Sequence, residues 1–252
     1  MIEVKNITKS YGNKKVVDNV SLNIQEGKIT SFIGPNGAGK STLLSIMSRL
    51  LKRDSGEVLL DGKDILDWDN KELAKKIAIL RQSNNINIRL TIRELVSFGR
   101  FPHSQGNLKE EDYKYIDEAI DYMQLKEFED RYLDELSGGQ RQRAWIAMTL
   151  AQETEIIILD EPTTYLDMSY QLEVLEVLQK LNKEKNITVV IVLHELNNAC
   201  RFADNIIGLK KGKIICQGRP LDVINKENLK EIYGIDANLT ISEDGQYPIC
   251  ME

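Results

Sequence analysis

The residues from Gly34 to Ser41 read Gly-Pro-Asn-Gly-Ala-Gly-Lys-Ser, a spacing that predicts a phosphate-binding loop. Glycines in this pattern let backbone N–H groups close around the phosphates of a nucleotide. Lys40 is expected to reach the β- and γ-phosphates, and the hydroxyl of Ser41 to hold Mg²⁺. An apolar stretch at 29–33 precedes the loop, and apolar residues at helical spacing follow it. A helix that starts directly after the loop also favours an anion through its dipole.

A second apolar run, from Ile156 to Leu159, ends in the adjacent carboxylates of Asp160 and Glu161. Ligands of open α/β sheets bind at the carboxyl ends of the strands. Asp160 is therefore expected beside the phosphate loop, where it would help to hold Mg²⁺. Because side chains alternate along a strand, Glu161 should point elsewhere and could act as general base on the attacking water. Taken alone, the pattern fits a buried strand that ends in an acidic turn equally well.

The third pattern is Leu-Ser-Gly-Gly-Gln at 136–140. Ser137 followed three residues later by Gln140 is a capping-box pattern, and a helix is predicted after it. A glycine inside a helix costs about 1 kcal/mol relative to alanine. A bare backbone and a serine hydroxyl at a helix start are well suited to grip a phosphate. We therefore interpret Gly138 and Gly139 as part of a second anion site, although a simple helix cap is the alternative.

Length and composition exclude several classes of protein. The chain of 252 residues is long enough for one large domain or two small ones. Its net charge of -6 argues against a general nucleic-acid binder. Three scattered cysteines without a C-x-x-C pair indicate neither a zinc site nor a disulfide framework, and fit a reducing compartment. No apolar run approaches the about 20 residues of a membrane span, and no signal peptide is expected at the start. If the protein works at a membrane, we expect it to do so through a partner.

The order of the predicted elements indicates an α/β fold. The first quarter of the chain is β-rich, residues 83–152 are mostly helical, and the last third returns to alternating strands and helices. Such alternation implies a parallel sheet with helices on both faces, and the helical middle is interpreted as a subdomain. The stretch after Gly234 carries no motif that we can interpret.

Together, the three patterns resemble the ATP-binding subunit of ABC transporters, in order and spacing over nearly the whole chain. The Ser-Gly-Gly-Gln element is far more specific than the phosphate loop, which many nucleotidases share. The resemblance implies an α/β fold with a P-loop NTPase core built on a mainly parallel sheet, an N-terminal antiparallel β subdomain and an inserted helical subdomain. Residues 1–252 would form a single ATP-binding domain, with its core at 1–83 and 153–252 and the helical subdomain at about 84–152.

The resemblance also implies roles for single residues. The residues implied in catalysis are Glu161, His194, Gln82 and Lys40. Those implied in ATP binding are Tyr11, Val16, Gly34, Pro35, Asn36, Gly37, Ala38, Gly39, Lys40, Ser41, Thr42, Ser137, Gly138, Gly139 and Gln140. Those implied in Mg²⁺ binding are Ser41, Gln82 and Asp160.

Four of these residues carry little signal without the family. Tyr11 offers a ring for stacking on adenine, with an ordinary strand-end tyrosine as the alternative. Val16 would line the same adenine pocket or belong to the core. Gln82 resembles the glutamine whose carbonyl contacts Mg²⁺ or water, and His194 resembles the switch histidine near the γ-phosphate. Glu195 stands where the family often has aspartate, which changes the reach of a minor hinge contact.

Partners follow from the same resemblance. In the family, two copies form a head-to-tail homodimer, in which ATP lies on the phosphate loop of one protomer and is covered by residues 137–139 of the other. Asp167 would meet the partner protomer. Integral-membrane permease subunits and, through them, a substrate-binding protein would be further partners, whereas nucleic acid is not expected. The protein would lie at the cytoplasmic face of the cell membrane as a peripheral subunit.

Three segments resemble one branch of the family, the importers of iron-siderophore, haem and vitamin B12, at 90–103, 161–167 and 194–204. The strongest likeness is to ferric-siderophore ATPases of petrobactin type. In the family, a groove near 82–103 accepts a coupling helix of the permease. The residues that would line this groove, or belong to the core instead, are Leu90, Ile92, Leu95 and Phe98. His103 is interpreted as non-catalytic.

The expected function is thus ATP hydrolysis that powers the import of a ferric siderophore. Other ABC transporters, for haem, vitamin B12, zinc, manganese or lipoprotein, stay open as alternatives. A soluble ABC-type ATPase of DNA repair or translation is disfavoured, because the chain has one ATPase half, no heptad stretch and an acidic balance. A nucleotide-binding protein without a motor role is the remaining alternative.

Overall fold

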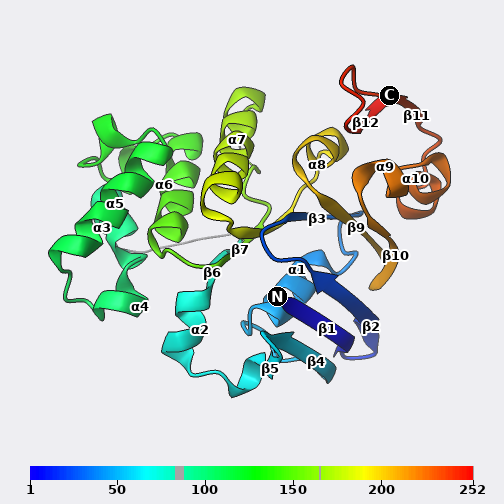
Figure 1. Cartoon of the computed structure of the whole chain (residues 1–252), viewed down its shortest axis with the longest axis horizontal. Coiled ribbons are helices and arrows are strands. Elements are labelled where there is room, and N and C mark those ends of the chain that lie inside the picture. Colours follow the sequence, from blue (N-terminus) through cyan, green and yellow to red (C-terminus); the bar gives the residue numbers. More distant parts are fainter. Residues whose placement is uncertain (83–87, 165, 252) are drawn as a thin grey trace. The chain divides into compact units, whose positions relative to one another are not determined.

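Residues 1–82, 88–164 and 166–251 are described by a computed structural model (Figure 1). The chain divides into two compact units, a first unit of Met1–Trp68 with Thr188–Glu252 and a second unit of Asp69–Ile187. Parallel strands and helices occur in both units, which confirms the predicted α/β class. The predicted division into an ATPase core and a helical subdomain uses other bounds than these two compact units, and it stays a prediction.

An antiparallel sheet opens the first unit, as predicted. Its strands pair in the order β2-β1-β4-β5, with the bounds β1 (Ile2–Tyr11), β2 (Lys14–Ile24), β4 (Ser55–Leu60) and β5 (Lys63–Asp64). In β1 the register with β2 shifts between Val4 and Ile7, and Asn6 has a φ of 51°. This bulge lets Ile7 turn inward beside Val4, so that both side chains are buried.

The second sheet of the first unit carries the phosphate loop. Its strands are β3 (Ile29–Ile33), β8 (Thr188–Val192), β9 (Asn205–Lys210) and β10 (Lys213–Gly218). β3 lies between β8 and β9 and is parallel to both, whereas β9 and β10 form an antiparallel hairpin. Every residue of β3 and β8 is buried, which fits the predominance of apolar residues in both strands.

Helices follow several of these strands. They are α1 (Lys40–Met47), α8 (Leu196–Phe202), α9 (Pro220–Val223) and α10 (Lys226–Tyr233), with a short 3₁₀ helix η1 (Ile65–Asp67). The stretch after Gly234 forms a hairpin of β11 (Asn238–Ile241) and β12 (Pro248–Met251). Asn197 of α8 binds the backbone of Cys250 in β12 through two hydrogen bonds of 2.8 and 3.0 Å, which anchors the hairpin.

The second unit is mostly helical and contains one parallel strand pair. Its elements are α2 (Asn70–Lys76), β6 (Ile77–Leu80), α3 (Ile92–Phe98), α4 (Phe101–Ser104), α5 (Glu110–Tyr122), η2 (Lys126–Phe128), η3 (Leu133–Glu135), α6 (Gly138–Ala151), β7 (Ile156–Asp160) and α7 (Met168–Lys185). Within this unit α3, α5 and α6 pack side by side (Figure 1). Residues 83–87, where the predicted helical region begins, lie outside the described residues.

The structure shows which apolar residues in and before α3 belong to the core and which are exposed. Ile92 and Leu95 are 0% exposed and belong to the core of the second unit, and Leu90 is buried as well. Ile92 and Leu95 share one face of α3, the helix that packs against α5 and α6. Phe98 is 51% exposed, so of these four residues it is the one whose side chain a partner can reach.

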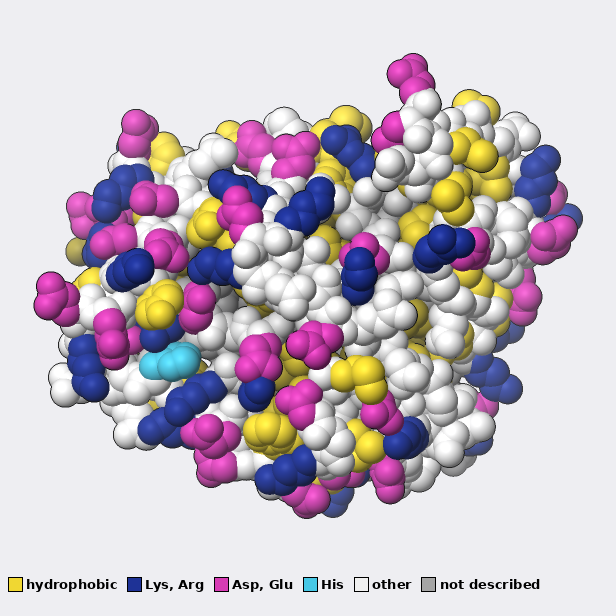
Figure 2. All heavy atoms as spheres, in the orientation of Figure 1, with side chains coloured by type: hydrophobic (Ala, Val, Ile, Leu, Met, Phe, Trp, Pro, Cys, Tyr) yellow, Lys and Arg dark blue, Asp and Glu magenta, His cyan; other side chains and the backbone are white. Residues whose placement is uncertain are grey.

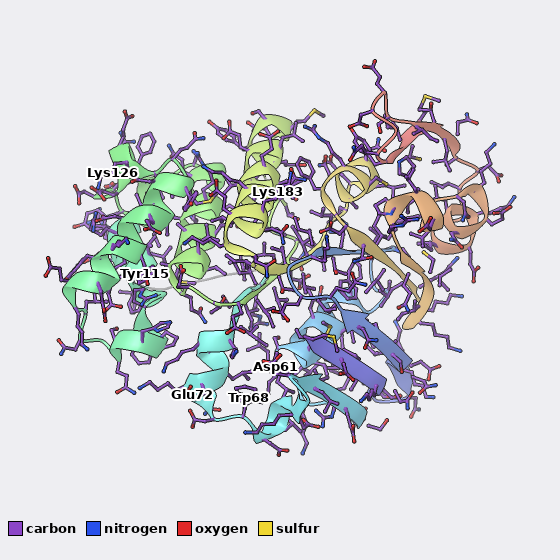
Figure 3. The ribbon with its side chains drawn as sticks, viewed as in Figure 1. Asp61, Trp68, Glu72, Tyr115, Lys126 and Lys183 are labelled. Carbon is purple, nitrogen blue, oxygen red and sulfur yellow. The ribbon has the colours of Figure 1, made fainter. Side chains whose placement is uncertain are left out.

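A buried ion pair ties the α3–α4 region to α5 and α6. Arg100 and Asp112 are each 4% exposed and lie 2.8 Å apart, and Arg100 also donates to the carbonyl of Ala151 at 2.9 Å. The guanidinium lies 4.3 Å from the ring centroid of Tyr115, which Figure 3 labels. At the surface, by contrast, acidic and basic side chains are interspersed over the visible face (Figure 2). No helix among the described residues is long and apolar enough to cross a bilayer.

Candidate functional site

The phosphate loop runs between β3 and α1 in the first unit, in the predicted order of strand, loop and helix. Gly34 and Gly39 have φ values of 140° and 105°, where L side chains are strained. A Cβ at Gly34 would lie 2.1 Å from the carbonyl oxygen of Leu209, and one at Gly39 would lie 2.4 Å from that of Val16. Both glycines are therefore required by backbone conformation and by the close approach of neighbouring strands.

Lys40 lies inside the loop with only 4% of its surface exposed. Its Nζ donates to the carbonyl oxygens of Gly34 at 2.7 Å and Pro35 at 3.1 Å. The first turn of α1 contains no acidic residue, so the positive end of the helix dipole is available to an anion. A buried ammonium beside this dipole makes the loop a site for negatively charged groups such as phosphates.

The turn between β9 and β10 supports the loop from outside. Gly212 donates its N–H to the carbonyl of Ala38 at 2.9 Å, and its own carbonyl accepts from the N–H of Asp18 at 2.8 Å. The carbonyl of Val16 faces Gly39 on the same side. The loop is thus held by backbone groups from strands that are distant in sequence.

The remaining loop residues and the predicted adenine contacts lie around this cradle in the first unit. Tyr11, at the end of β1, is 53% exposed, and Val16 is half-buried in β2. Asn36 and Gly37 are exposed at the tip of the loop, whereas Ser41 and Thr42 are half-buried in the first turn of α1. An exposed ring at Tyr11 is available for stacking, and its contact with adenine stays a prediction.

His194 follows the carboxyl end of β8 and is exposed. Since β8 and β3 are parallel and Val192 pairs with Phe32, His194 and the phosphate loop emerge at the same edge of their sheet. His103, in contrast, is engaged structurally, because its Nε2 lies 2.9 Å from the carbonyl oxygen of Gln152. The exposed position of His194 is compatible with a phosphate contact, which stays a prediction.

In the second unit, Gln82 and Glu161 lie against each other. Nε2 of Gln82 donates to Oε2 of Glu161 at 2.5 Å, and the carboxylate of Glu161 also accepts from the hydroxyl of Thr164 at 3.4 Å. Glu161 is 8% exposed and has a φ of 54°, a conformation that non-glycine residues adopt mainly under constraint. Burial and the hydrogen bonds from Gln82 and Thr164 therefore hold this carboxylate in a defined position.

The contact between Gln82 and Glu161 was not predicted from the sequence. A strand was predicted only before Glu161. The structure adds β6 before Gln82, and β6 and β7 are parallel neighbours with Leu80 opposite Leu159. Asp160 is the last residue of β7 and is half-buried. Alternation along the strand places its side chain on the face opposite to that of Leu159.

The chemistry of the predicted Mg²⁺ ligands suits a hard cation. Ser41, in the first unit, offers a hydroxyl, whereas Asp160 and Gln82, in the second unit, offer a carboxylate and an amide oxygen. Mg²⁺ is usually bound by one or two carboxylates together with phosphate oxygens and water. Over residues 1–82, 88–164 and 166–251 no cluster of three His, Cys, Asp or Glu side chains could hold a metal by itself. These donors thus fit a cation that arrives with a phosphate ligand.

The Ser-Gly-Gly-Gln element begins α6 and forms the predicted capping box. The hydroxyl of Ser137 accepts from the N–H of Gln140 at 3.2 Å, and Oε1 of Gln140 accepts from the N–H of Ser137 at 3.1 Å. Ser137 and Gly138 are exposed, and a Cβ at Gly138 would meet no described atom within 4 Å. A Cβ at Gly139 would lie 3.4 Å from Cδ2 of Leu166. This helix start is capped locally but open to a ligand.

Asp167 directly precedes α7 and caps it, because its side chain accepts from the N–H of Tyr170 at 3.4 Å. Its side chain is exposed. Its predicted contact with a partner protomer stays a prediction, and the neighbouring Tyr165 lies outside the described residues.

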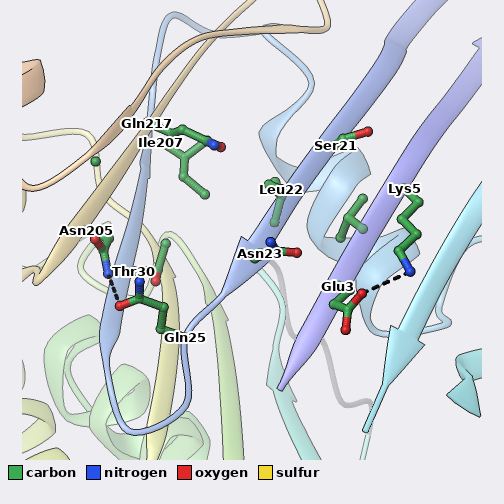
Figure 4. Close-up of a pocket in the computed structure, with 12 residues that line it drawn as sticks. Glu3, Lys5, Ser21, Leu22, Asn23, Gln25, Thr30, Asn205, Ile207 and Gln217 are labelled. Carbon is green, nitrogen blue, oxygen red and sulfur yellow. Dashed lines mark hydrogen bonds and ion pairs between the residues drawn. The ribbon is translucent and has the colours of Figure 1, made fainter. Parts of the chain in front are cut away.

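A separate cavity of about 590 Å³ lies at the other end of β3 (Figure 4). Its polar lining comprises an ion pair of 3.0 Å between Glu3 and Lys5 and several carboxamides, among them Gln25 and Asn205 at 3.3 Å. Thr30 also lines it, and its buried hydroxyl has no hydrogen-bond partner among the described residues. With mostly uncharged amides, this cavity differs from the cationic phosphate loop and is not the predicted anion site.

Known proteins resemble this chain in sequence and in fold. A family model described as ABC transporter matches residues 17–164. The chain is 57% identical to the petrobactin import ATP-binding protein of Bacillus subtilis (strain 168), over 92% of each chain. It is 46% identical to the iron(3+)-hydroxamate import ATP-binding protein of the same strain, over 96% of this chain and 90% of that one. A dimeric bacterial ABC transporter cassette superposes with a TM-score of 0.79 at 38% identity, over 87% of this chain and 98% of that chain.

Proposed function

This chain belongs to the ABC transporter family, and on that premise we propose that it hydrolyses ATP to power the import of a ferric siderophore. The observation that carries the ATPase is the glycine cradle around the buried Lys40, at the carboxyl end of a parallel strand. The substrate class is supported by the names of the two relatives, which refer to petrobactin import and to iron(3+)-hydroxamate import.

ATP binds first through the phosphate loop of the first unit. Backbone N–H groups of the loop and the start of α1 receive the phosphates, and Lys40 turns from the carbonyls of Gly34 and Pro35 toward them. Tyr11 stacks on the adenine, with Val16 beside it. Ser41, Asp160 and Gln82 would hold Mg²⁺, which would supply positive charge to neutralise the phosphates.

Hydrolysis needs a base that removes a proton from water. In this proposal Oε2 of Glu161 accepts that proton, and the amide of Gln82 fixes the orientation of the carboxylate through their hydrogen bond. His194, at the edge that also carries the phosphate loop, contacts the γ-phosphate. Lys40 stabilises the negative charge that develops on the transferred group.

The open start of α6 points to a second copy of the chain. Ser137, Gly138 and Gly139 of one protomer cover the ATP held by the other, and the symmetric arrangement closes on itself. The capping box keeps the helix formed before the nucleotide arrives. ATP then holds the homodimer closed, and hydrolysis opens it.

This cycle drives a permease in the membrane, which receives the chelate from a substrate-binding protein. The ATPase works at the cytoplasmic face of the cell membrane as a peripheral subunit. Phe98, exposed at the end of α3, is available for contact with the permease. Neither the chelate nor a nucleic acid needs to touch this chain.

The substitution Glu161→Gln tests the ATPase. It should lower phosphate release at least about a hundredfold, because the general base is lost, and it should trap an ATP-bound dimer. Light scattering after gel filtration measures the dimer. Glu155→Gln is the matched control, because Glu155 lies just before the same strand but is 65% exposed. A Glu161→Gln protein that stays monomeric with ATP and hydrolyses it normally would contradict the assignment.

The chelate is identified by uptake in a deletion strain. Radiolabelled iron is supplied as petrobactin, as a hydroxamate siderophore or as haem, and labelled vitamin B12, zinc and manganese are offered in parallel. We expect the uptake of one siderophore class to be lost and to return with the wild-type gene but not with Glu161→Gln. Loss of haem, vitamin B12 or metal uptake instead would replace the siderophore assignment.

A further inference from the structure

The last residue of α10 touches the first residue of the phosphate loop. The hydroxyl oxygen of Tyr233 accepts a hydrogen bond of 2.9 Å from the N–H of Gly34, across 199 positions of sequence. Gly34 is buried, and buried backbone N–H groups nearly always require a partner. The carbonyl of the same residue accepts from Lys40 at 2.7 Å. Tyr233 and Lys40 therefore hold Gly34 from its two sides.

The position of α10 is fixed by its packing on β9. A Cβ at Gly208 would lie 2.6 Å from Cδ1 of Ile232, so the helix sits directly on the strand at this point. Gly208 pairs with Ile33, the residue before Gly34, and the carbonyl of the next residue, Leu209, crowds Gly34. The helix and the loop thus share β9 as a common support.

The tyrosine hydroxyl is suited to a permanent contact. Burial is the main cause that raises the pKa of Tyr233, to about 12. The side chain therefore stays neutral at physiological pH, and a neutral hydroxyl can accept and donate hydrogen bonds together. The contact does not switch with pH in the range where the protein works.

From these contacts we infer that Tyr233 is a positioning residue for the phosphate loop, outside the residues that match the family model. The inference rests on the proposed ATP site. When Lys40 leaves the carbonyl of Gly34 for a phosphate, the loop loses one of its internal hydrogen bonds. Tyr233 then keeps the Gly34 peptide in the orientation that phosphate binding needs. The C-terminal helix α10 thereby contributes to nucleotide affinity without touching the nucleotide.

Tyr233→Phe removes the hydroxyl and keeps the ring. It should raise the Kd for ADP and for a non-hydrolysable ATP analogue about five- to tenfold, because a buried N–H loses its acceptor. KM for ATP should rise with it, whereas kcat at saturating ATP should stay within about twofold, since Tyr233 reaches no reacting atom. Calorimetric titration and steady-state phosphate release measure the two effects separately.

A direct readout distinguishes positioning from general stability. In nucleotide-free protein, the amide proton of Gly34 should shift upfield in the Tyr233→Phe variant, as expected for a lost hydrogen bond. Tyr122→Phe is the matched control, because the hydroxyl of Tyr122 bonds only the exposed Glu184 among the described contacts, at 3.4 Å. It should change neither the Gly34 resonance nor the nucleotide affinity.

A second variant keeps the inference testable if Tyr233→Phe does not fold. A fluorinated tyrosine at position 233 retains the shape but weakens the oxygen as an acceptor, and it should lower nucleotide affinity by a smaller factor. If either variant keeps wild-type nucleotide affinity and an unchanged Gly34 resonance, the inference about Tyr233 is overturned, whereas the proposed function is not affected. If the wild type binds no adenine nucleotide, the proposed function falls together with it.

Discussion

The two helix starts prepared for phosphate differ in how they are built. In the first unit, α1 begins at Gly39 without a side-chain cap, and its first residue, Lys40, is 4% exposed. In the second unit, α6 begins with the capping box of Ser137 and Gln140, and Ser137 and Gly138 are exposed. Both present the positive end of a helix dipole. One lies inside its own unit, and the other stands open to the solvent.

The start of α1 has its surroundings shaped by residues distant in sequence. The cradle of α1 is shaped by Leu209, Val16 and Gly212, so its geometry exists before a ligand arrives. The start of α6 is capped by local hydrogen bonds between Ser137 and Gln140. It can therefore act as a cover on a nucleotide that another protomer holds, as in the proposed homodimer.

The largest effect is expected at the buried cation of the first helix start. Lys40→Met should reduce ATP hydrolysis about a thousandfold, because the ammonium that balances the phosphate charge is lost. Phosphate release at saturating ATP measures this loss. Lys52→Met, an exposed lysine shortly after α1, serves as control and should leave the rate unchanged. A Lys40→Met protein with half of the wild-type rate would show that the cradle alone carries catalysis.

The buried cation of the second unit should instead matter for stability. Asp112→Asn leaves the guanidinium of Arg100 buried without its carboxylate and should lower the free energy of unfolding by about 3 kcal/mol. Chemical denaturation measures the change. Asp222→Asn is the control, because its ion pair with Arg219 is exposed and should contribute little. Equal effects of the two substitutions would contradict the role of burial.

The contribution of the Arg100–Asp112 ion pair to stability should decrease at acidic pH. Burial alone would raise the pKa of Asp112, but hydrogen bonds from the Lys109 backbone and from Arg100 outweigh it and hold that pKa below its usual value. A carboxyl whose pKa is lowered in the folded state stabilises the protein at pH values above its unfolded-state pKa of about 3.9. This stabilisation is lost as the pH falls through the folded-state pKa. The difference in stability between wild type and Asp112→Asn should therefore be full above about pH 5 and shrink below about pH 4.

Substituting alanine for glycine should have opposite effects on stability in the phosphate loop before α1 and at the start of α6. Gly34→Ala should lower the free energy of unfolding by about 2 kcal/mol and weaken ATP binding, because the new Cβ meets the carbonyl of Leu209 at a strained φ. Thermal unfolding and calorimetric titration measure the two effects. Wild-type stability would mean that β9 moves aside without loss.

Gly138→Ala should give the smallest change in stability and of opposite sign. The Cβ meets open space, and alanine favours a helix over glycine by about 0.5–1 kcal/mol, so the unfolding temperature should stay or rise. Hydrolysis should nevertheless fall about tenfold, if this backbone approaches a phosphate closely in the dimer. Full activity would show that the start of α6 does not cover the nucleotide.

The local motifs of this protein could be predicted from the order of its residues. The phosphate loop with its strand and helix, the capping box at Ser137 and the acidic end of β7 each occupy a few consecutive residues. Their geometry follows from spacing along the chain, because backbone conformation, capping and alternation act between near neighbours. These patterns were also sufficient to indicate the α/β class.

The contacts between residues distant in sequence could be identified only from the folded structure. Gln82 meets Glu161 across 79 positions, Tyr233 meets Gly34 across 199, and α3 buries Ile92 while it exposes Phe98. Such pairs depend on which strands become neighbours and on which face of a helix finds a partner. Side-chain burial and hydrogen bonding across these distances are set by the packing of whole elements, which spacing along the chain does not encode.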